Sequence, residues 1–120
     1  GLFSIVDLRH DLPTEWHKAI TVKSDEGIYS MDLNKIDQMI PYFLQYKKKS
    51  LKATDLIVAT DVKADGFKLN EDTLEPSAKI GDLETYALTE QSLSIENWKL
   101  ILPEDAIKAD QMFLISRLTI

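Results

Sequence analysis

Apolar and polar positions alternate most clearly towards the end of the chain. Across residues 97–103, tryptophan and leucine side chains alternate with Lys99, which is the period-two pattern of a strand with one buried face. Pro103 ends this pattern because proline cannot donate to a strand ladder. Across residues 111–120, apolar residues occupy both parities, which indicates a central strand buried between layers. We expect these two segments to be neighbouring strands of one core sheet.

Shorter runs of the same kind predict further strands. They span residues 3–8, 28–33, 56–62, 85–88 and 93–95. Residues 63–82 are polar and contain turn-forming glycine and proline, so we expect a long loop region in which only residues 67–69 can pair. Seven or eight short strands at this spacing are typical of a β-sandwich.

Two stretches predict short helical turns. Asp11 is a candidate N-cap and Pro13 suits a first turn, so residues 11–19 predict one or two helical turns. The apolar face of this helix would be formed by Leu12, Trp16, and Ala19 or Ile20. Residues 34–40 also have helical spacing, and the proline that follows should end the turn before an extended segment over residues 42–46.

Together these elements predict a mainly β fold, an antiparallel, jelly-roll-like β-sandwich of seven or eight short strands with one or two short helical turns. Residues 1–120 suffice for one such domain and its core. The chain begins with Gly1 in place of methionine, and Phe3 opens directly into strand-like sequence. We therefore expect a single domain excised from a larger protein, or a mature product after processing.

Charge is distributed unevenly along the chain. The formal net charge is −6, and residues 61–120 carry all of it, with twelve acidic and six basic side chains. Such a negative field repels phosphate backbones, so we expect no nucleic-acid partner. No apolar run approaches the roughly 20 residues of a membrane span, so we expect no membrane span either. Cysteine is absent, which excludes a disulfide framework and a thiolate metal site.

One acidic segment partly resembles a calcium-binding loop. Asp61, Asp65 and Asp72 have suitable spacing, but Lys63 and Leu69 occupy positions that should supply ligands. A polar hairpin with a glycine-assisted turn is therefore the favoured interpretation. A looser surface calcium site remains an alternative, with ligands drawn from Asp61, Asp65, Glu71 and Asp72.

The sequence contains no recognisable catalytic constellation, so we expect no enzyme activity, no catalytic residues and no cofactor. His10 and His17 are seven residues apart, whereas a zinc pair on one helix or strand prefers closer spacing. No Gly-x-Ser-x-Gly motif is present. Adjacent carboxylates such as Glu104 and Asp105 fall in turn-like sequence, where such groups are usually solvated.

An aromatic cluster is the best candidate for a ligand contact. Tyr42, Phe43 and Tyr46 directly precede the basic run 47–49, which includes Lys48. Aromatic faces beside cations can bind sugar rings or nucleic acid. The alternative is a solvated loop whose lysines protect an exposed strand from aggregation.

Two segments and one central point resemble a known family. The first segment is Pro13 with its acidic, aromatic and basic neighbours and Ile20. The second segment is the run 98–103 with Ile107, Asp110 and residues 112–115, and the central point is Ile40-Pro41-Tyr42. This pattern resembles the C-terminal β-sandwich region of the A components of bacterial insecticidal toxin complexes and related neuraminidase-like-region proteins. The resemblance implies a β-sandwich that packs against the rest of a large pore-forming or translocating subunit. It carries no catalytic residue over to this chain.

These observations lead to a ranked set of functions. The first is a noncatalytic β-sandwich module of a large bacterial toxin-like or surface protein, serving assembly or host-surface attachment. Its partners would be other domains of the parent protein, and a glycan or host-surface receptor. A secreted or cell-surface location is favoured under this hypothesis. A carbohydrate-binding module is the alternative, and a small hydrolase is the second alternative.

Overall fold

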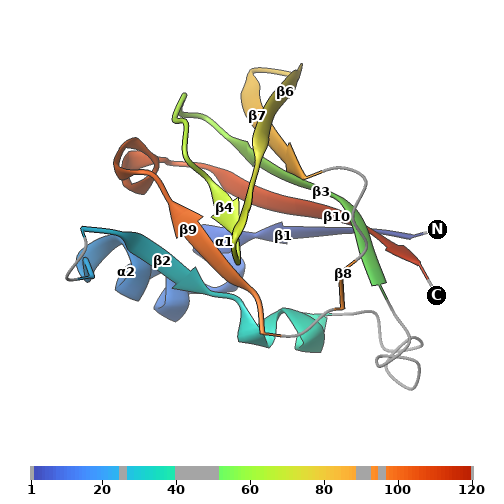
Figure 1. The fold of residues 1–120 in the computed structure, drawn as a ribbon, viewed down its shortest axis with the longest axis horizontal. Helices are drawn as coiled ribbons and strands as arrows, with labels where there is room; N and C mark the ends of the chain where they lie inside the picture. Colours follow the sequence, from blue (N-terminus) through green and yellow to red (C-terminus); the bar gives the residue numbers. More distant parts are fainter. Residues whose placement is uncertain (1, 25–26, 40–51, 89–92, 95–96, 120) are drawn as a thin grey trace.

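The computed structural model describes residues 2–24, 27–39, 52–88, 93–94 and 97–119. The described chain is mainly β and forms two antiparallel sheets with few helices, as a β-sandwich requires. Ten strands are assigned in these ranges, against the seven or eight expected from the sequence. Figure 1 shows the two sheets crossing each other, with the blue helix of residues 13–21 beside the smaller sheet.

The larger sheet contains six strands. In spatial order they are β1 (Leu2–Asp7), β10 (Met112–Thr119), β3 (Lys52–Thr60), β7 (Leu83–Leu88) and β6 (Glu75–Ile80), and β8 (Leu93–Ser94) also pairs with β3. We call it the large sheet. β1 and β6 are its two edges, and β10 lies between β1 and β3.

The smaller sheet contains four strands. In order they are β2 (Tyr29–Asp32), β9 (Lys99–Leu102), β4 (Lys68–Leu69) and β5 (Asp72–Thr73). We call it the small sheet. The helical segments are α1 (Leu8–Asp11), α2 (Pro13–Thr21) and two 3-10 helices, η1 (Asn34–Met39) and η3 (Glu104–Lys108).

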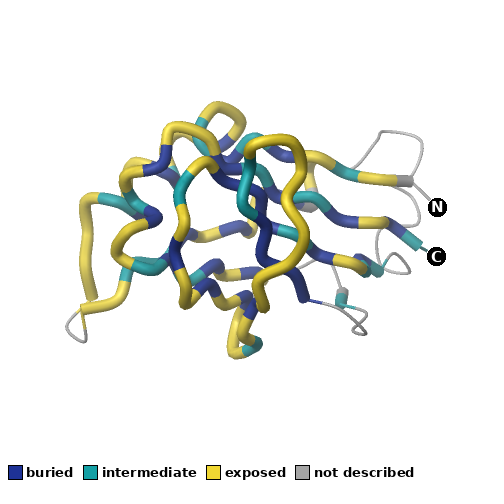
Figure 2. Tube along the Cα trace, turned by 90° about the horizontal axis from the view of Figure 1, so that it is seen from above, coloured by how far each residue is buried: buried dark blue, intermediate teal, exposed yellow. Residues whose placement is uncertain are grey.

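The inner faces of both sheets and one side of α2 meet in a single hydrophobic core. In the small sheet, Met31, Leu100 and Leu69 lie side by side in register and are fully buried. In the large sheet, Leu114 and Val58 are paired and equally buried. Figure 2 shows how buried and exposed positions alternate along the chain, as strands with one core face require.

β9 and β10 are strands as expected, but the prediction that they are neighbours in one sheet is wrong. β9 pairs with β2 and β4 in the small sheet, whereas β10 pairs with β1 and β3 in the large sheet. The physical reason lies between them: Pro103 ends β9, and η3 carries the chain from one sheet to the other. β10 is central in its sheet, but Phe113 and Ile115 on its outer face are only half-buried because no described layer covers them.

The helical start also differs from the prediction. The chain turns helical directly after β1, and Asp7 caps α1 by accepting a hydrogen bond from the backbone N–H of His10. Asp11 is not the N-cap of α2; its carboxylate accepts instead from the backbone N–H of Asp7. α2 begins at Pro13, after Leu12, without a side-chain cap. Its predicted apolar face is confirmed, with Leu12, Trp16 and Ala19 buried.

The largest error in the sequence-based strands concerns residues 63–82. These residues contain β4, β5 and β6, although only residues 67–69 were expected to pair. All six residues of β6 are exposed, so it has no apolar alternation to reveal it. β3 likewise begins four residues earlier than expected, at Lys52. The predicted extended segment 42–46 lies outside the described residues.

Candidate functional site

A groove of about 880 Å³ lies beside the small sheet. It is bounded by α2, the outer face of β2, the start of β9 and the first residues of η1. Pockets that bind small molecules in proteins commonly have volumes of about 300–1,000 Å³. This groove therefore has the size of a ligand site, and we call it the α2 groove.

The wall of the groove is one side of α2. A helix repeats every 3.6 residues, so side chains three or four positions apart share a face. One face of α2 carries the core residues Leu12, Trp16 and Ala19. The face that lines the groove carries Thr14, Glu15, Lys18 and, just after the helix, Val22. The same helix thus closes the core and presents polar groups to the groove.

The floor of the groove is the polar face of two neighbouring strands. Asp32 of β2 lies opposite Lys99 of β9 in the antiparallel register, and both line the groove. Asn70 holds the start of β9 in place: its side-chain oxygen accepts from the backbone N–H of Lys99 at 3.1 Å, and its own N–H donates to the carbonyl of Lys99 at 2.8 Å. Trp98 is only 3% exposed, so its ring belongs to the core. The floor therefore offers polar groups and no aromatic platform.

The charged groups of the groove are unequally paired. Glu15, whose side chain is 13% exposed, forms an ion pair with Lys35 at 3.1 Å and so links α2 to η1. Asp32 accepts a hydrogen bond from the backbone N–H of Asn34 at 2.7 Å. Lys18 and Lys99 form no ion pair with any described residue. The groove thus has one more cation than carboxylates, although the whole chain is acidic.

A second candidate surface is the outer face of the large sheet. Ile5 lies opposite Ile115, Ile115 opposite Ile57, and Ile57 opposite Ala87, so these four residues form one row across four strands. Phe3 lies two residues before Ile5 on the same face of β1. Ala87 is itself buried, at 8% exposed, so we call the surface formed by Phe3, Ile5, Ile57, Phe113 and Ile115 the apolar face.

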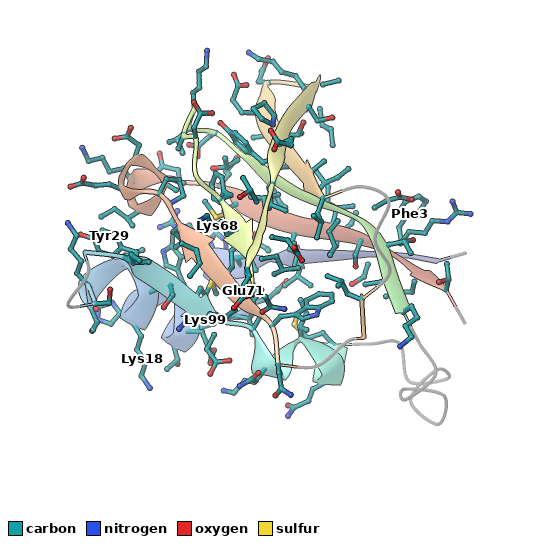
Figure 3. The ribbon with its side chains drawn as sticks, in the orientation of Figure 1. Phe3, Lys18, Tyr29, Lys68, Glu71 and Lys99 are labelled. Carbon is teal, nitrogen blue, oxygen red and sulfur yellow. The ribbon has the colours of Figure 1, made fainter. Side chains whose placement is uncertain are left out.

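The apolar face is most exposed at β1. Phe3 is 68% exposed and Ile5 is 66% exposed, which makes them the two most exposed large apolar residues of the described chain. Figure 3 shows Phe3 at the end of the large sheet near which both ends of the chain lie in Figure 1. Neighbouring exposed apolar residues of this kind, unlike scattered ones, mark interaction surfaces.

The residues predicted to bind sugar fall outside the structural description. Tyr42, Phe43, Tyr46 and Lys48 all belong to residues 40–51, so that prediction stays a prediction. The α2 groove was not anticipated from the sequence. Its only sequence signal is the polar stripe of α2, which looks like an ordinary solvated helix face until β2 and β9 are placed beside it.

Among the described residues, no group of three carboxylates or histidines is close enough to hold a metal ion, so the calcium alternative stays a prediction. Asp61 joins two strands. Its carboxylate accepts hydrogen bonds of 3.1–3.2 Å from the backbone N–H groups of Asp110 and Gln111, just before β10. Asp65 is exposed and Asp72 lies in β5.

Replacing Asp61 by alanine should lower the free energy of unfolding by about 1 kcal/mol, because the two backbone N–H groups lose their acceptor. Urea unfolding of the variant and the wild type measures this. The matched control is Asp65→Ala, which removes an exposed carboxylate and should change stability by less than about 0.5 kcal/mol. A rise in wild-type stability on adding calcium, absent from Asp61→Ala, would instead support the calcium alternative.

The histidines likewise form no catalytic arrangement with the groove. His10 contacts Asp7 at 2.8 Å on the exposed side of α1, and neither His10 nor His17 lines the groove. None of the described helices is long and apolar enough to cross a membrane. Comparison of the chain with protein-family models, curated proteins and solved structures found no match.

Proposed function

We propose that this domain is a noncatalytic module of a larger bacterial toxin-like or surface protein, and that it packs through the apolar face against another β-rich part of the same assembly. The single observation that carries the proposal is the exposure of Phe3 and Ile5 beside the half-buried Ile115. Burying one such side chain contributes about 1.5–3 kcal/mol. A partner that covers the row would therefore bind through the hydrophobic effect.

The two edges of the large sheet indicate where the partner lies. β6 carries Glu75, Pro76 and Lys79, the charged and proline residues that protect an edge strand from pairing. β1 carries neither charge nor proline before Asp7 at its end, and in the described chain it pairs only with β10. Its free backbone edge can accept a further strand, and Phe3 and Ile5 lie directly beside that edge. A β-rich partner would satisfy both the backbone and the apolar face.

The resemblance of the sequence to the C-terminal region of toxin-complex A components supports the same proposal, since that region packs against the rest of its subunit. Attachment to a host surface belongs to the proposal as a second role, with a glycan or protein receptor as the partner. The noncatalytic part has its own test. Turnover of a hydrolase substrate by the pure protein, abolished by one point substitution, would contradict it.

The docking surface can be tested with the isolated domain, because an uncovered apolar face should drive self-association and bind a hydrophobic dye. We expect light scattering to show concentration-dependent association of the wild type. The double variant Phe3→Lys, Ile5→Lys should be monomeric and should bind less dye. Because both side chains are mostly exposed, its thermal stability should stay close to that of the wild type.

The control for this experiment is Ile80→Lys. Ile80 is also exposed, but it lies at the end of β6, on the protected edge. This substitution adds one positive charge and removes one exposed apolar side chain without touching the apolar face. It should leave association and dye binding unchanged. A monomeric wild type without dye binding, or an equal effect of Ile80→Lys, would overturn the proposed docking surface.

A further inference from the structure

The α2 groove combines two kinds of polar group that a single ligand class would satisfy. Lys18 of α2 and Lys99 of β9 both line the groove, and neither forms an ion pair with a described residue. Lysine ammonium groups bind carboxylate, sulfate or phosphate through charge-assisted hydrogen bonds. The groove is therefore suited to a ligand that carries at least one negative charge.

Besides the charged side chains of Glu15, Asp32 and Lys35, the lining contains neutral hydrogen-bonding groups. It includes the hydroxyls of Thr14 and Ser30 and the side-chain amides of Asn34 and Asn97. Hydroxyl and amide groups both donate and accept, so they match ligand hydroxyls better than they match an apolar surface. Val22 supplies exposed apolar surface at the rim, and the buried ring of Trp98 is not available for stacking. This lining disfavours flat aromatic ligands such as nucleobases.

From the size of the groove, its unpaired lysines and its neutral hydrogen-bonding groups, we propose that the α2 groove binds an acidic saccharide, in which a carboxylate contacts Lys18 and Lys99 and the ring hydroxyls contact the neutral groups. The ion pair between Glu15 and Lys35 at 3.1 Å joins α2 to η1 and holds one end of the groove in shape. Asn70 does the same for the start of β9. The site is separate from the apolar face, so it does not depend on the proposed docking function.

The test uses the wild-type domain and two matched sugars. Glucuronic acid carries the carboxylate, and glucose has the same ring without it. Titration followed by backbone amide NMR should show that glucuronate shifts amide signals in α2 and at the start of β9, whereas glucose shifts them much less. Inorganic sulfate, added as a third ligand, should bind more weakly than glucuronate because it cannot use the neutral groups.

Charge variants locate the site. Lys18→Gln and Lys99→Gln should each weaken glucuronate binding by about two- to fivefold, the range expected for one exposed ion pair, and the double variant should weaken it by about tenfold. The control is Lys68→Gln, because Lys68 is an exposed lysine of the same sheet, on β4, that does not line the groove. It should leave glucuronate affinity unchanged.

Four results would each overturn the proposal. The first is equal binding of glucose and glucuronate, which would remove the role of the lysines. The second is equal binding of sulfate and glucuronate, which would reduce the groove to a nonspecific anion site. The third is an equal loss of affinity in Lys68→Gln. The fourth is the absence of any shift of the α2 and β9 amides with all three ligands.

Discussion

Replacing Phe67 by alanine should lower the free energy of unfolding by about 3–5 kcal/mol. Phe67 is fully buried, and its ring lies 4.8 Å from the ring of Tyr86, between the small sheet and the large sheet. Removing it loses the transfer free energy of the ring and leaves a cavity that the two sheets cannot easily close. Natural domains are stable by only about 5–15 kcal/mol, so this single change threatens folding. Urea unfolding would measure this loss of stability, provided that the slope of the unfolding free energy against urea concentration is the same in the variant and the wild type.

The control is the same substitution at an exposed position, Phe3→Ala. Phe3 is 68% exposed, so its truncation should change stability by less than about 0.5 kcal/mol. The pair separates two roles of one residue type, since Phe67 acts within the core and Phe3 on the apolar face. A similar loss of stability in both variants would mean that β1 is covered in the folded domain, and it would contradict the proposed docking surface.

The second large effect is expected for Tyr86→Phe, which should lower stability by about 1–3 kcal/mol. The Tyr86 hydroxyl accepts a buried hydrogen bond from the backbone N–H of Ala64 at 2.8 Å, and Ala64 is only 4% exposed. Phenylalanine keeps the ring packing but leaves that N–H without its partner in a place that water does not reach. The hydroxyl therefore fastens the loop after β3 to β7.

Hydrogen exchange makes the second prediction specific. The amide of Ala64 should exchange faster in Tyr86→Phe, while amides in the middle of β10 should change only as the overall stability changes. The control is Tyr29→Phe at a half-buried tyrosine on β2, which should stay within about 0.5 kcal/mol of the wild type. An unchanged exchange rate at Ala64 would show that this hydrogen bond does not form in solution.

Alternation along the sequence predicts a strand where one of its faces is buried, and it fails where none is. β9 and β2 were recognised because every second side chain in each is apolar, and these include the buried Leu100 in β9 and Met31 in β2. β6 was missed because all its residues are exposed, so no apolar alternation marks it. Its links to β7 are the backbone ladder, the ion pair between Lys79 and Glu84 and the hydrogen bond from the Thr85 hydroxyl to the Ala78 carbonyl, and none of these produces a hydrophobic pattern. Which strands pair was also beyond the pattern, since β9 and β10 have equally apolar sequences and yet belong to different sheets.

The candidate sites show the same limit. Asp61 has a spacing that suits calcium, but its partners are backbone N–H groups of Asp110 and Gln111, about 50 residues away along the chain. Lys18 and Lys99 look like ordinary solvated residues, and only the packing of α2 beside the small sheet brings them to one groove. The sequence also did not reveal that the apolar face is exposed, because Phe3 and Ile5 alternate with their neighbours just as residues on a buried strand face do.

The pairing of β1 with β10 also has a consequence for how the domain is made. Leu2 lies opposite Leu118, so the first and last described strands of the domain are neighbours, and β10 alone joins β1 to β3. Contacts between such distant parts of a chain form slowly, because a long loop must close before they contribute any stability. A ribosome that has not yet released β10 holds a chain whose large sheet lacks its central strand. The domain should therefore acquire its structure only after synthesis has passed residue 119, and a truncation before β10 should yield an unfolded chain rather than a smaller folded one.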